Sequence, residues 1–230
     1  MGNEITSAYR QQTTLPQITA DNNLGFPRHN AAMEQIITPS SAQWAREGRL
    51  WQVSNPARET ALAMGGTSFS DTAPMITLDV ASGTTMIPRL VILNQGGTVA
   101  GGVITVLLTA DNKLRFSSGG TALTPANCRV DVNSAHPTAT AVTAYYGTTA
   151  GAITAAAKAL DFTVEGRILP ADVTPAVDTW NVGQYTWRGG DEAPVLRGPA
   201  SFVIYASAAT TQPSFFFRIV WAEVPTASIV

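Results

Sequence analysis

The sequence is poor in charge and in cysteine. Only 13% of its 230 residues are charged, and just two of those are lysines, whereas an ordinary soluble domain carries roughly 25% charged residues. Because charge on a surface discourages association, a chain with so little of it favours contact with other protein. The one cysteine, Cys128, excludes an intramolecular disulfide, and we interpret it as a small buried apolar side chain rather than a reactive thiol.

Long apolar and long basic runs are also lacking. The longest apolar run, residues 215–222, is interrupted by Arg218 and is too short to span a bilayer. The first residues show neither the basic nor the apolar region of a secretory signal, so we expect the chain to be made and kept in a cytoplasm, at least until it assembles. The net charge of −2 and the scattered basic residues argue against nucleic acid or an anionic membrane as a partner.

Residues 1–45 are predicted to form an extended N-terminal arm. Prolines and polar runs break any period, and apolar residues are too sparse for a core of their own. Such an arm is either disordered or laid across a neighbouring subunit, where it could add a strand to a sheet edge. The arm is nearly neutral, which favours a protein partner. Ser40 and Ser41 could cap one short helix over residues 42–47, ended by Gly48.

The pattern from Leu50 onward predicts β-structure. Short segments with partial alternation lie between turn residues, with no βαβ pattern, which is typical of sandwiches and barrels. We therefore predict that residues 46–230 form an all-β, antiparallel β-sandwich of jelly-roll type. Pro88 is expected to mark a strand start or edge, and the last strand is expected at a sheet centre. The predicted strands are residues 50–53, 61–64, 75–80, 87–93, 103–108, 113–116, 128–132, 139–146, 162–169, 179–187, 195–196, 201–206 and 215–224.

No constellation of residues predicts catalysis, a cofactor or a metal. His29 and His136 lie far apart in polar stretches, typical of solvated loops. Asp79, Asp111 and most other aspartates are single and lie at predicted turns or strand ends, where they satisfy backbone N–H groups. The adjacent pair Asp191–Glu192 would serve a glycan hydrolase only if the fold set two carboxylates across a sugar, and sequence adjacency does not place them so. We expect no enzymatic activity.

Three aromatic residues close together form the candidate contact patch. Trp180, Tyr185 and Trp187 lie on one predicted strand with a bend at Gly183. They could stack on a sugar, fill the sandwich core or lie in a subunit interface. Because aromatic residues are enriched at the buried centres of interfaces, we take the three as interface candidates.

Two segments carry a resemblance to a known class. The C-terminal run over residues 201–225, which includes Phe202–Val203–Ile204–Tyr205 and Phe215–Phe216–Phe217, resembles the closing hairpin of small β-sandwich structural proteins of tailed bacteriophages, and so does the segment over residues 117–127. The resemblance implies a virion protein that decorates or cements a capsid, often as a trimer, with itself and other capsid proteins as partners. A tail fibre or receptor-binding component with a carbohydrate-binding face, and a jelly-roll major capsid protein, remain alternatives.

Overall fold

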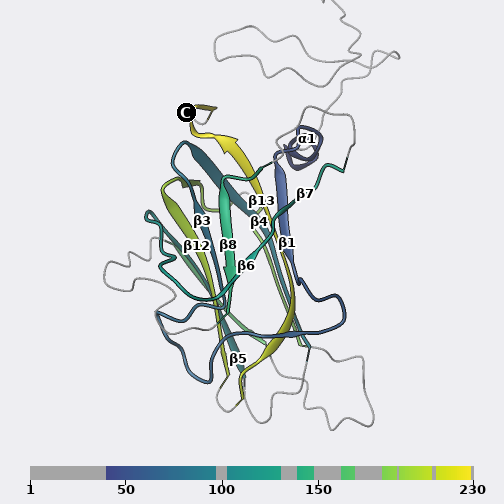
Figure 1. Ribbon diagram of the computed structural model, residues 1–230, viewed down its shortest axis with the longest axis vertical. Coiled ribbons are helices and arrows are strands. Elements are labelled where there is room, and N and C mark those ends of the chain that lie inside the picture. The colour runs from purple at the N-terminus through teal and green to yellow at the C-terminus, as the bar shows by residue number, and fades with distance from the viewer. Residues whose placement is uncertain are drawn as a thin grey trace, which may run out of the picture.

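The computed structural model describes residues 40–96, 103–130, 139–147, 162–168, 183–190, 192–208 and 211–228. In these residues two antiparallel sheets face each other (Figure 1), so the predicted all-β sandwich is confirmed. The helical elements of the described part are α1 (Ser40–Arg46), which ends close to the predicted position, and a final turn, Thr226–Ser228. The predicted arm falls mainly on residues 1–39, which lie outside the described residues, and jelly-roll connectivity stays a prediction.

The first sheet has seven strands. In spatial order its main path is β10 (Gln184–Arg188), β4 (Thr84–Gln95), β13 (Ser214–Pro225), β1 (Leu50–Ser54) and β7 (Ala126–Asn127). Two short strands lie off this path: β11 (Leu196–Arg197) pairs with β4, and β2 (Leu62–Ala63) pairs with β13. The predicted central position of the last strand is confirmed, since β13 lies between β4 and β1.

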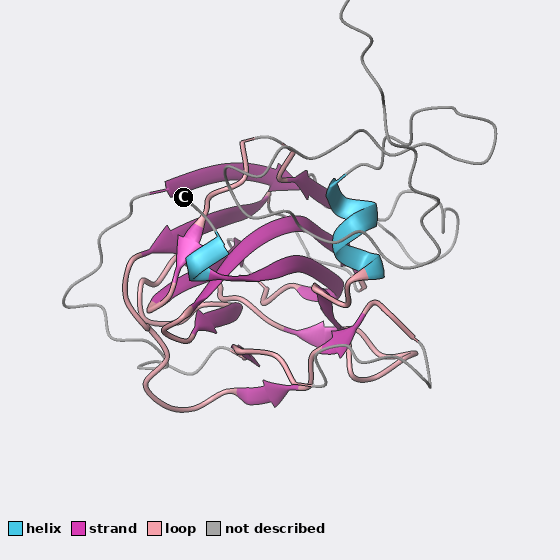
Figure 2. Cartoon of the chain, turned by 90° about the horizontal axis from the view of Figure 1, so that it is seen from above, coloured by secondary structure: helices cyan, strands magenta, loops and turns pink. Residues whose placement is uncertain are grey.

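The second sheet has six strands. Their order is β6 (Thr121–Leu123), β8 (Val142–Tyr146), β3 (Ile76–Val80), β12 (Ala200–Ala208), β5 (Ile104–Asp111) and β9 (Phe162–Ile168). Viewed from above (Figure 2), the strands lie in layers and α1 lies at one side of them. Tyrosine and threonine in β8, and valine and isoleucine in β3 and β5, are residues that fit a pleated, half-buried surface.

The core fills the space between the sheets. Inward side chains alternate with outward ones, because successive residues of a strand point to opposite faces. Trp221 and Phe215 of β13 and Phe202 of β12 are fully buried in one cluster contributed by both sheets. Burial of each large apolar side chain stabilises the fold by about 1.5–3 kcal/mol, so this shared cluster holds the two sheets together.

Pro88 departs from its predicted place at a strand start or edge. It lies inside β4, which is paired on both sides, and its partner on β13 is Trp221. The register shifts here: Val220 pairs with Leu90, which leaves Arg89 as an extra residue. Proline has no N–H to donate to a ladder and is tolerated within sheets at such bulges. The bulge therefore explains how a central strand accommodates the proline.

Two other strand predictions are wrong in the described residues. Residues 113–115 are irregular, and Phe116 forms only an isolated bridge. Arg115 and Phe116 donate their backbone N–H groups to a side chain, Asp79, so these groups are satisfied without a ladder. Residues 128–130, the described part of the predicted strand over 128–132, are also irregular, and the short strand β7 ends just before them.

Candidate functional site

Tyr185 and Trp187 of the predicted aromatic patch point into the sandwich. Both lie on β10, where partly buried residues alternate with the exposed Gln184, Thr186 and Arg188. The two aromatic side chains pack against the core cluster. The Trp187 ring centroid lies 5.9 Å from that of Phe202, on the facing sheet, at a tilt of 32°.

Tyr185 contacts the edge strand of the other sheet. A Cβ atom built on Gly166 of β9 would lie 2.1 Å from Cε2 of Tyr185, so the ring sits where only a glycine leaves room. Burial raises the pKa of the Tyr185 hydroxyl. The ring thus helps to close the side of the sandwich where β9 and β10 meet.

The three aromatic candidates are therefore not brought together as one described patch. Trp180 lies outside the described residues. Tyr185 and Trp187 pack against the sandwich core, which is one of the alternatives that the sequence left open. Their role as interface residues stays a prediction.

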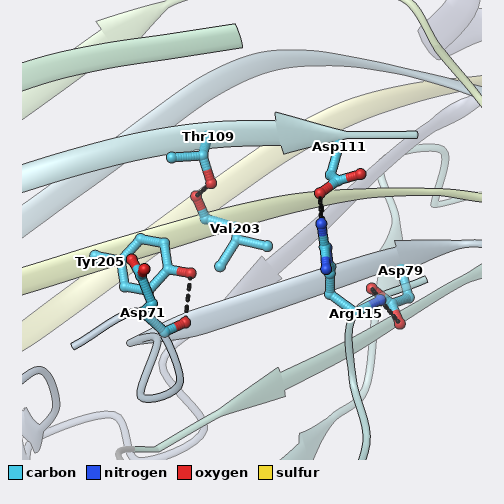
Figure 3. Close-up of polar contacts among 7 residues, drawn as sticks. All are labelled: Asp71, Asp79, Thr109, Asp111, Arg115, Val203 and Tyr205. Carbon is cyan, nitrogen blue, oxygen red and sulfur yellow. Dashed lines mark hydrogen bonds and ion pairs between the residues drawn. The ribbon is translucent and has the colours of Figure 1, made fainter. Parts of the chain in front are cut away.

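A buried polar row crosses the outer face of the six-stranded sheet. Ser201 of β12 is paired in register with Asp79 of β3 on one side and with Asp111 of β5 on the other. All three are buried, and Ser201 is 0% exposed. Arg115 lies over the row, 3% exposed, and donates from Nε to Asp111 Oδ2 at 2.7 Å, while its Nη2 pairs with the same oxygen. Figure 3 shows Arg115 between Asp111 and Asp79.

Asp79 is held by backbone donors. Its Oδ2 accepts the N–H of Phe116 at 2.9 Å and that of Arg115 at 3.1 Å. Burial raises the pKa of Asp79 above its ordinary value, and the N–H groups of Phe116 and Arg115 and the charge of Arg115 offset this only in part. Desolvation is the dominant cause because few waters reach the carboxylate to stabilise its charge.

The row holds the segment that crosses the sheet, and we call Asp79, Asp111 and Arg115 the clamp. Asp79 accepts the backbone N–H of Arg115, and Asp111 accepts from its guanidinium. The ring of the next residue, Phe116, stacks on Tyr145 of β8 at 3.6 Å between centroids. Oδ1 of Asp111 and Oγ of Ser201 are buried without a hydrogen-bond partner. These contacts fix the segment over residues 112–116 against the outer face of the sheet.

The interpretation of Asp79 and Asp111 as separate turn residues is therefore too simple. Asp79 does accept backbone N–H groups, as expected, but from a segment 36 positions away along the chain. Asp111 is instead the partner of Arg115. The spacing of four residues between Asp111 and Arg115 is the one signal in the sequence that could have indicated this pair.

A second contact covers the same outer face. The Tyr205 hydroxyl donates to the carbonyl oxygen of Asp71 at 3.0 Å, and the Phe69 ring lies 5.2 Å from the Tyr205 ring. Burial, with the negative charge of Asp71 as a smaller cause, raises the pKa of Tyr205 well above its ordinary value. Val203 and Tyr205 are both buried although they face away from the main core, and Leu107 packs against them.

The outer face of the seven-stranded sheet is different, because its outward residues include exposed ones on several strands. Arg218 and Ser54 are exposed on β13 and β1, and Gln184, Thr186 and Arg188 are exposed on β10. Between them lie partly exposed apolar side chains, those of Leu90, Ile92 and Phe216. We define this surface, the outward residues of β10, β4, β13 and β1, as the open face.

The remaining sequence candidates lie singly or outside the described residues. Cys128 is free and partly buried; burial raises the pKa of its thiol, and the nearby charge of Arg218 lowers it to a smaller extent. Glu192 is exposed, while Asp191, His29 and His136 lie outside the described part. Among the described residues no group of three His, Cys, Asp or Glu side chains could hold a metal ion. No described helix is long and apolar enough to cross a membrane.

Comparisons with known proteins add no relative: no family model matches the chain, and no curated protein or solved structure is significantly similar to it.

Proposed function

We propose that this chain is a virion structural protein without enzymatic activity, a capsid decoration, cement or minor capsid protein of a tailed bacteriophage. It acts through protein–protein contacts with copies of itself, as a trimer, and with other capsid proteins. The proposal extends the resemblance carried by residues 201–225 and 117–127.

The observation that supports the proposal best is the contrast between the two outer faces. The described carboxylates and tyrosine of the six-stranded sheet are used to hold the chain's own segments, as in the clamp of Asp79 and Asp111 on Arg115. The open face of the other sheet leaves apolar side chains partly exposed in a chain with only 13% charged residues. A broad, weakly charged sheet surface suits a protein that works by contact.

The test is the mass and binding behaviour of the full-length chain. We expect light scattering to give the mass of a trimer and cosedimentation to show saturable binding to capsid shells prepared without this protein. A monomer with no affinity for shells would contradict the proposal. Closed particles formed by the purified chain alone would instead indicate a major capsid protein, and binding on a glycan array would indicate a receptor-binding part.

A further inference from the structure

The arrangement of charge on the open face points to the chemistry of its partner. Arg218 of β13 and Arg188 of β10 are both exposed. Among the described residues, none of the outward side chains of β10, β4, β13 and β1 is an aspartate or a glutamate. The open face is therefore positive, although the chain as a whole has a net charge of −2.

The strand registers fix how these residues are spaced. Arg218, Ile92 and Thr186 are paired across β13, β4 and β10, and in the neighbouring row Val220, Leu90 and Arg188 are paired in the same order. The two arginines are thus two strands and two residues apart. Strand spacing and rise place their Cα atoms about 12 Å apart, with Leu90 and Ile92 of β4 between them.

The guanidinium groups are not neutralised within the described chain. Arg218 donates from Nε to the side-chain amide oxygen of Gln52 at 2.8 Å, an uncharged partner. The ion pairs of Arg49 with Glu47 and of Arg115 with Asp111 both lie away from the open face. An exposed guanidinium without a carboxylate can take one from another protein, with two parallel hydrogen bonds.

One end of the face is bounded by α1. Arg89, the extra residue of the β4 bulge, lies 5.5 Å from the ring centroid of Trp44 of α1 and donates to the carbonyl oxygen of Gly190. The helix α1 and the turn at Gly190 therefore border the open face at that end. Leu90, Ile92 and the two arginines form a continuous patch beside them.

We propose that the open face docks onto an acidic, partly apolar surface of another capsid protein, with carboxylates that pair with Arg188 and Arg218 on either side of an apolar contact at Leu90 and Ile92. This inference rests on the proposed function and names the surface and the partner chemistry that would carry it. Charge complementarity selects such a partner over a second copy packed face to face, which would set arginine against arginine.

The experiment measures binding of full-length variants to capsid shells prepared without this protein. Arg188→Glu and Arg218→Glu are each expected to weaken binding about tenfold, since a like charge then faces the partner's carboxylate. Arg218→Lys keeps the charge but loses the two parallel hydrogen bonds, so it should weaken binding less than Arg218→Glu. Lys113→Glu is the matched control, because Lys113 is exposed on the segment over the opposite face. It should change the dissociation constant less than about twofold. Thermal unfolding checks that each variant is folded.

The outcomes separate this inference from the proposed function. If the wild type binds shells and both arginine reversals bind equally well, the docking face is wrong while the proposed function stands. If the wild type does not bind, both are wrong. If light scattering shows that Arg188→Glu and Arg218→Glu dissociate an oligomer without changing shell binding, the open face binds a second copy of the chain. The assignment of an acidic partner is then overturned.

Discussion

Arg115 folds back four residues onto Asp111, and both side chains are buried on the outer face of the six-stranded sheet. The pair lies beside Ser201 of β12, which stands in register between Asp111 of β5 and Asp79 of β3. A buried ion pair adds little stability compared with apolar residues of the same shape, but removing one partner leaves an uncompensated charge. Removing either partner of this pair is therefore expected to lower the stability of the fold strongly.

Replacement of Arg115 is expected to destabilise the protein strongly. Arg115→Met keeps the side-chain volume but leaves the Asp111 carboxylate buried without its cation, at a cost of about 3–5 kcal/mol. Urea unfolding followed by fluorescence measures the loss. Arg49→Ala is the control: it breaks the partly exposed pair with Glu47 and should cost under about 1 kcal/mol. Equal losses in the two variants would contradict the clamp, and Asp111→Leu should recover part of the loss in the Arg115→Met background.

The raised pKa of Asp79 predicts a direction of pH dependence. Because the folded state holds this proton more tightly than the unfolded state, whose pKa is near 3.8, Asp79 favours folding at low pH. Its contribution to the unfolding free energy falls as pH rises from 3.8 to the raised value and stays low above it. Asp79→Asn should therefore flatten this part of the pH profile. An NMR titration that placed the Asp79 midpoint below 3.8 would show the opposite sign.

Gly65 and Gly83 can be compared to test how closely the backbone of β12 approaches Gly65. Both have a positive φ, 91° and 88°, but a Cβ on Gly65 would lie 2.3 Å from the carbonyl oxygen of Ala206, whereas one on Gly83 would meet nothing within 4 Å. Alanine at Gly83 should cost only the backbone strain, about 1–2 kcal/mol. Alanine at Gly65 should cost about 1–3 kcal/mol more, because the strand β12 must move. Equal unfolding free energies for the two variants would show that the contact relaxes freely.

The two sides of β10 should respond differently to truncation. Trp187→Ala removes a ring that packs against the core and Phe202, and we expect a loss of about 2–4 kcal/mol. Thr186→Ala changes the exposed neighbour on the open face and should stay within about 0.5 kcal/mol. Thermal and urea unfolding distinguish them. A Trp187→Ala variant as stable as Thr186→Ala would mean that the tryptophan does not support the core.

Much of the secondary structure follows from local pattern. Alternation and turn residues predicted strands close to β1, β3, β8, β9, β12 and β13, and the apolar run over 215–224 predicted a central strand. Pro88 and residues 113–116 depart from the prediction for one reason, which is that both depend on segments far along the chain. Pro88 lies at a bulge opposite β13, and the N–H of Phe116 is bound by the Asp79 carboxylate. Local propensity contains no information about such distant partners.

The sequence by itself determined that the chain is an all-β protein with little charge, because side-chain alternation and composition are local properties. Only the tertiary structure decided that Asp79, Ser201 and Asp111 form one row, since strand register is set by packing of whole sheets. The same packing turned Tyr185 and Trp187 inward and left Arg188 and Arg218 on an open face. Which of two faces a strand residue occupies depends on the sheet that packs against it, and that partner lies elsewhere in the chain.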